Sequence, residues 1–142
     1  MSEENETADI LKSVEGGQEL LDWLEPFRVY ERPHPNFGDA EVVSLMLRRQ
    51  GPSELIVRLD LPSQSAVVTF FLRDWIDLRV SGFSHQNVIS GLIIRRAGER
   101  DIAVWEVGMG CTPGEHEIEL EPCFGAYGII RATLVKVRLQ RL

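Results

Sequence analysis

The sequence has few of the features that mark membrane, disulfide-rich or metal-binding proteins. It contains two cysteines, Cys111 and Cys123, which form no Cys-x-x-Cys pair and therefore no zinc-site spacing. Its most apolar stretches, residues 66–72 and 88–94, have seven residues each, whereas a membrane helix needs about 20. We therefore expect no disulfide framework, no metal, no cofactor and no membrane partner.

Catalytic motifs are also scarce. The chain has no Gly-x-Ser-x-Gly, no His-Glu-x-x-His and no Gly-Lys-Ser/Thr phosphate loop. The glycine-rich run 108–114 lacks a lysine and does not open a helix, so its glycines are expected to shape a turn between strands. The sequence predicts a protein that is not an enzyme.

Negative charge is concentrated at the N-terminus. Residues 1–25 hold eight acidic and one basic side chain, and residues 26–142 hold 14 of each, so the whole net charge of −7 lies in the leading segment. This disfavours nucleic acid, which binds through Lys and Arg, and favours a basic protein partner. An acidic solubilising tail is the alternative. Because the first residues also lack the basic start and apolar run of a secretory signal, we expect a cytoplasmic protein with reduced cysteines.

Hydrophobic patterning divides the chain into an acidic leader, 1–25, and a single β-rich domain, 26–142. Residues 1–6 are expected to be disordered, because they are polar, charged and without apolar period. Thr7 is predicted to cap a short helix that ends at Gly16-Gly17. A second helix is predicted from Gln18 to Leu24.

From residue 39 onward, apolar and polar residues alternate as in half-buried strands. Strands are predicted over residues 41–49, 55–61, 66–73, 75–80, 92–96, 102–107, 115–121 and 129–139. Eight short strands separated by turn signals predict an antiparallel β sandwich or a curved, partly closed sheet.

Four glutamates alternate along one predicted strand: Glu115, Glu117, Glu119 and Glu121. The period of two places them on one face about 6.6 Å apart, with Ile118 and Leu120 toward the core. Two interpretations remain open. The face is either a solvated strand surface or a surface that binds a basic protein.

Two polar clusters lie at strand ends, residues 37–41 and 82–88. Asp39, Glu41 and His85 in these clusters have the chemistry of an acid/base or metal site. The alternative is that polar side chains here pair with backbone groups left without partners by the turns. Phe37 and Phe83 are expected to pin the two loops to the core.

These two clusters and a third at residues 121–128 carry a family resemblance. The order Phe-x-Asp-Ala-Glu-Val, Gly-Phe-x-x-Gln-Asn-Val and Pro-x-aromatic-Gly, followed by a long terminal strand, resembles the Immunity protein 50 family of bacterial polymorphic toxin systems over residues 37–139. The chain departs from the family at Gly38, where members often have histidine. The resemblance implies a small cytoplasmic protein that binds a toxin domain, often a nuclease, and neutralises it without catalysis.

We therefore predict an immunity protein that occludes the active surface of a cognate toxin. Its predicted partner contacts are Asp39, Glu41, His85, Asn87, Glu115, Glu117, Glu119 and Glu121. Two other classes stay open: a small-ligand or carbohydrate-binding β module in which Trp75 and Trp105 line a pocket, and an enzyme that uses Asp39, Glu41 and His85. The sequence leaves the oligomeric state open.

Overall fold

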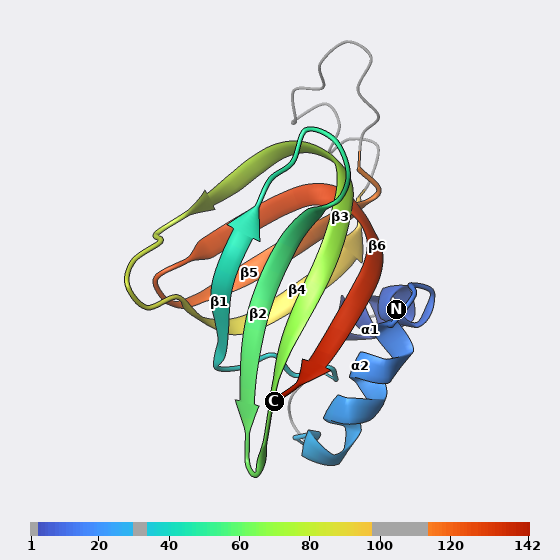
Figure 1. The fold of residues 1–142 in the computed structure, drawn as a ribbon, viewed down its shortest axis with the longest axis vertical. Helices are drawn as coiled ribbons and strands as arrows, with labels where there is room; N and C mark the ends of the chain where they lie inside the picture. Colours follow the sequence, from blue (N-terminus) through green and yellow to red (C-terminus); the bar gives the residue numbers. More distant parts are fainter. Residues whose placement is uncertain (1–2, 30–33, 98–113) are drawn as a thin grey trace.

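The computed structural model describes residues 3–29, 34–97 and 114–142 (Figure 1). Two helices, α1 (Glu3–Lys12) and α2 (Gly17–Leu24), and a 3-10 turn, η1 (Glu25–Phe27), precede the strands. The strands are β1 (Ala40–Met46), β2 (Ser53–Leu61), β3 (Gln64–Ser81), β4 (Val88–Arg96), β5 (His116–Phe124) and β6 (Tyr127–Arg141). The predicted strand 102–107, Cys111 and most of the glycine-rich run fall outside the described residues.

The strands form one antiparallel sheet that closes into a barrel in the order β1-β2-β3-β6-β5-β4. The mainly β, antiparallel prediction is confirmed, and the sheet closes into the barrel through a short pairing of β1 with β4. Alternation along β2 shows why these residues form such a wall. Leu55, Val57 and Leu59 are buried in the barrel, while Arg58 and Asp60, on either side of Leu59, are exposed.

β3 corrects one prediction from the sequence. Residues 66–73 and 75–80 were expected to form two strands, but they belong to a single strand, Gln64–Ser81. Its pairing with β6 is irregular between Arg73 and Asp77, and Asp74 has a φ of 53°. Such an irregularity bends a long strand around a barrel and breaks the alternation, which explains why the sequence pattern looked like two strands.

Large apolar side chains fill the barrel. Phe37 is 1% exposed, and its ring packs edge-on against Phe70 with 6.1 Å between centroids. The prediction that Phe37 pins its loop to the core is therefore confirmed. Close packing of this kind fixes the positions of the loops at the barrel ends.

The N-terminal helices complete the barrel wall. The β1–β4 pairing covers only Ala40↔Ile89 and Glu41↔Val88, which leaves the rest of the β4 edge without a strand partner in the described structure. Helix α1 packs along this edge, where Thr7 Oγ1 donates to Ile94 O and accepts from Ile94 N–H, both at 3.0 Å. Covering an open edge in this way removes a site for unwanted strand pairing.

The helix assignments differ from the sequence expectations at two points. Helix α1 already begins at Glu3, within the segment that was expected to be disordered. Thr7 lies inside α1 and does not cap it. Its hydroxyl bonds to the N–H and O of Ile94 because this edge of β4 has no strand partner for them in the described structure. No local pattern in the sequence indicates this contact.

Both helices belong to the core. They bury six apolar side chains in the same cluster as the barrel: Ile10, Leu11, Leu20, Leu21, Trp23 and Leu24. The turn between the helices adds a backbone contact, because Val137 N–H donates to Glu15 O at 2.8 Å. None of the helices in the described ranges is long and apolar enough to cross a membrane.

Candidate functional site

Three loops that are far apart in the sequence meet at one end of the barrel. They comprise residues 37–41, 82–88 and 122–127, which we call the three-loop face. Asn87 joins them: its backbone O accepts at 2.7 Å from the N–H of Val42, the residue directly after the first segment, and its Oδ1 accepts from Ala126 N–H at 3.1 Å. Loop 82–87 and the β5–β6 turn project together on the side away from the helices (Figure 1).

Asn87 shapes the face from within. Its Oδ1 also accepts from Ser84 N–H, and its Nδ2 donates to Ser84 O, each at 2.9 Å. Asn87 was predicted as a partner contact, and the structure gives its side chain a positioning role in the loop. This matches the interpretation that polar residues at strand ends pair with the backbone.

Three aromatic side chains stand out on the three-loop face: Phe83 at 49%, Phe124 at 57% and Tyr127 at 46% exposure. Phe83 was expected to anchor its loop in the core, and that expectation is wrong. Gly82 has a φ of 77°, a left-handed conformation that turns the chain so that residue 83 leaves the barrel. A Cβ at Gly82 would lie 2.7 Å from Cε1 of Tyr127, so the Tyr127 ring lies directly over this glycine.

Two predicted carboxylates border the face. Asp39 and Glu41 are exposed, and neither forms an ion pair within the described ranges. Asp39 adopts the left-handed region with a φ of 65°, and its N–H donates to Ile89 O at 2.9 Å, which holds the loop against β4. Both carboxylates are therefore available to a partner.

His85 is exposed on loop 82–87. No hydrogen bond joins His85 to Asp39 or Glu41 among the described residues, and no group of three or more His, Cys, Asp or Glu there could hold a metal ion. The three residues share one end of the barrel without forming an acid/base constellation.

Glu115, Glu117, Glu119 and Glu121, which we call the glutamate ridge, lie on and just before β5. An arginine that was not among the residues predicted from the sequence binds the two central glutamates of this ridge. Arg95 on β4 donates from Nε to Glu117 at 3.0 Å and from NH1 to Glu119 at 2.9 Å. Burial acts to lower the pKa of Arg95, but the hydrogen bonds that it donates to Glu119 and Glu117 outweigh burial and raise the pKa. Glu117 is itself only 9% exposed, so the expectation of a solvated ridge fails at its centre.

The ends of the ridge behave differently. Glu121 packs its carboxylate over Gly91 of β4, and it is half-buried. Glu115 is exposed, and its N–H donates to Thr133 Oγ1 at 2.9 Å. The pairing register alone brings Arg95 beside Glu117, and this neighbour on another strand is invisible in the local sequence.

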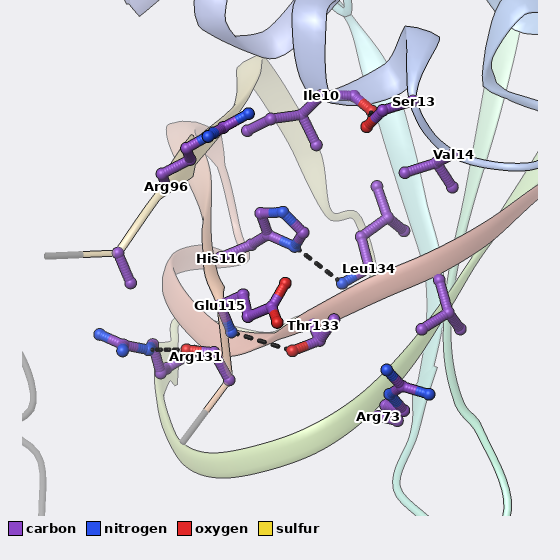
Figure 2. A pocket seen from close by; sticks show the side chains of 13 residues that line it. Ile10, Ser13, Val14, Arg73, Arg96, Glu115, His116, Arg131, Thr133 and Leu134 are labelled. Carbon is purple, nitrogen blue, oxygen red and sulfur yellow. Dashed lines mark hydrogen bonds between the residues drawn. The ribbon is translucent and has the colours of Figure 1, made fainter. Parts of the chain in front are cut away.

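A cleft of about 830 Å³ lies between α1 and the start of β5 (Figure 2). Its centre holds His116, whose Nδ1 accepts from Leu134 N–H at 3.0 Å. Burial lowers the pKa of His116. The histidine and Thr133 thus replace backbone pairing where β5 and β6 diverge.

Three arginines line the cleft: Arg73, Arg96 and Arg131. Arg131 is 2% exposed; its Nε donates to Gly114 O at 2.6 Å, and its NH1 has no hydrogen-bond partner among the described residues. In Figure 2, Arg73 and Arg131 lie at opposite sides of the cleft, and the guanidinium groups do not converge on one point. The side chains of Trp75 and Trp105, which the alternative of a small-ligand or carbohydrate-binding module places in a pocket, fall outside the described part of the chain.

Phe124 and Tyr127 lie on the three-loop face but are not among the contacts predicted from the sequence. Both flank the Gly125 turn in the third resemblance segment. Phe124 lies in the Pro-x-aromatic-Gly turn and Tyr127 two residues after its glycine. This position was the signal that could have identified them, because a ring next to a tight turn has less barrel wall to pack against.

Comparison of the chain with protein-family models, with curated proteins and with solved structures gives no match.

Proposed function

We propose that this protein is a cytoplasmic immunity protein that binds a cognate toxin and neutralises it by covering the active surface of the toxin. The proposal rests on the resemblance of residues 37–139 to the Immunity protein 50 family. In such a role the protein forms an interface and carries out no reaction of its own.

One observation carries the proposal. The three segments that hold the resemblance lie more than thirty residues apart in sequence, yet hydrogen bonds of Asn87 join them at one end of the barrel. Together they expose three aromatic rings and two carboxylates on a rigid scaffold. A surface that combines aromatic anchors with charged neighbours is typical of protein–protein recognition.

The exposed acidic residues of the N-terminal helices favour a partner with a basic surface. Acidic residues of the leader lie on the exposed side of α1, α2 and the adjoining turns: Asp9, Glu15, Glu19, Asp22 and Glu25. Because these helices bury their apolar side in the core, the negative charge of the leader is fixed to one side of the molecule. Together with the net charge of −7, this makes the protein as a whole attractive to a cationic protein such as a nuclease.

Toxin neutralisation tests the proposal directly. The purified product of the adjacent toxin gene is assayed for its activity, beginning with nuclease activity, in the presence of increasing amounts of this protein. We expect inhibition that saturates near one equivalent. Undiminished toxin activity at stoichiometric excess rejects the proposed function.

A small-ligand-binding module is the second candidate, favoured by the cleft beside His116. Under this alternative, a ligand that enters the cleft raises the unfolding temperature and shifts the His116 ring resonances in NMR spectra. Both measurements are made with a panel of sugars and of small carboxylate and phosphate anions. Stabilisation by one of these compounds, together with no effect on the toxin, would favour this alternative.

A further inference from the structure

We propose that the three-loop face is the toxin-binding surface, and that it takes a segment of the toxin bearing Arg or Lys side chains. This inference rests on the proposed function, and it names the surface and the chemistry of its partner. Phe83, Phe124 and Tyr127 are the anchors in this arrangement, and Asp39 and Glu41 are the charged rim.

The three rings are held in place before any partner arrives. Tyr127 begins β6 opposite Ser81, and Phe124 ends β5 opposite Val88, so both rings project from paired strands. Phe83 belongs to the loop that Asn87 and Ser84 fix by hydrogen bonds. Rings on a rigid backbone lose little conformational entropy on binding, which is the property of side chains that dominate interfaces.

Another ring of this protein shows the chemistry that we expect at the face. Phe71 has the Arg138 guanidinium 4.8 Å and the Lys136 ammonium 5.9 Å from its ring centroid. No cation from the described ranges stacks in this way on Phe83, Phe124 or Tyr127. Open rings on the same face as carboxylates that lack ion pairs in the described ranges suit guanidinium or ammonium groups.

Charge argues for a toxin and against a second copy of this chain. A symmetric dimer through this face would bring Asp39 and Glu41 of each copy toward the same carboxylates of its partner, in a protein of net charge −7. Like charges across an interface are unfavourable, whereas a cationic segment satisfies them. The β5 ridge is a weaker candidate, because Arg95 already pairs with Glu117 and Glu119.

Binding of the toxin to single variants tests the anchors. Phe83→Ala, Phe124→Ala and Tyr127→Ala are compared with Met46→Ala and Val29→Ala, which remove apolar side chains of similar exposure elsewhere on the surface. We expect at least a tenfold rise in Kd for two of the three aromatic variants. The controls are expected to stay within twofold of the wild type.

Two further variants test the charged rim. Asp39→Asn and Glu41→Gln are compared with Glu19→Gln and Asp22→Asn on α2. Asn is suited to position 39 because it tolerates the left-handed backbone found there. We expect the rim variants to bind more weakly and to lose part of the salt dependence of binding, and we expect a smaller effect from the α2 variants.

The outcomes separate the two proposals. If the wild type neutralises the toxin and all three aromatic variants bind as it does, the interface lies elsewhere and this inference is overturned, while the proposed function stands. If the wild type does not bind the toxin, the proposed function fails and this inference fails with it. Dimerisation of the wild type that the aromatic variants abolish would name a second copy as the occupant and also overturn the inference.

Circular dichroism checks folding, and Phe→Leu replaces Phe→Ala where a variant unfolds.

Discussion

Asn87 holds the turn before β6 from 39 positions away, because its Oδ1 accepts the Ala126 N–H at 3.1 Å. The same oxygen accepts from Ser84 N–H, so one side chain sets the shape of two neighbouring loops. The exposed rings on those loops are therefore positioned by a residue that need not touch a partner.

Replacing Asn87 tests this positioning role. Asn87→Ala removes three hydrogen bonds, and at about 0.5 kcal/mol for each partly exposed bond the free energy of unfolding falls by about 1–2 kcal/mol. Asn87→Asp keeps the accepting oxygen and is expected to lose less. Urea denaturation measures both. An Ala variant with wild-type stability and weakened toxin binding would instead identify Asn87 as a direct contact.

The Thr7 hydroxyl stabilises the seam between α1 and β4. Thr7→Val keeps the shape of the side chain but leaves the N–H and O of Ile94 without this partner in a buried setting. We expect a loss of about 1–3 kcal/mol in the free energy of unfolding. Thr7→Ser keeps the hydroxyl and serves as the control. Equal stability of the Val variant and the wild type would contradict the edge-covering role.

Arg95 forms ion pairs with two carboxylates at once, those of Glu117 and Glu119. Arg95→Met leaves Glu117 nearly buried without its cation, and we expect destabilisation by about 1–3 kcal/mol. Adding Glu117→Gln should recover part of the loss, because the unpaired charge is then removed. Arg58→Met breaks the exposed pair with Asp60 and is expected to change stability little. Thermal and urea unfolding compare the variants, and equal effects of Arg95→Met and Arg58→Met would refute the distinction.

His116 links stability to pH. Burial lowers its pKa, so below about pH 6.5 the unfolded chain binds a proton more readily than the folded protein. The stability contributed by neutral His116 is thus complete above about pH 6.5 and declines as the pH falls below that value. Urea unfolding at pH 7.5, 6.5 and 5.5 should show this decline.

His116→Asn removes the titrating ring and keeps an acceptor near the Nδ1 position, so it should flatten the decline. His34, whose pKa is lowered by burial and by Arg28, contributes in the same direction and is replaced in a parallel variant. The exposed His85→Asn variant is the matched control. An unchanged slope in His116→Asn would show that this histidine does not carry the effect.

The sequence predicted local features well. The alternation of Leu55, Val57 and Leu59 with polar residues reported a half-buried strand, and the burial of Phe37 followed from an aromatic residue beside a strand start. The strand prediction succeeds because side-chain direction in a strand depends only on sequence position. The sequence failed at β3, where an irregularity interrupted the alternation, and at Phe83, where the left-handed turn at Gly82 reversed the expected direction.

By itself the sequence determined a mainly β, antiparallel protein with its negative charge in the first 25 residues. Tertiary structure alone decided that the sheet closes into a barrel, that the acidic leader forms part of its wall, that Arg95 pairs with Glu117, and that three distant loops meet at Asn87. The reason is physical: strand register and loop contacts join residues dozens of positions apart, and the free energy that selects them comes from packing the whole core at once.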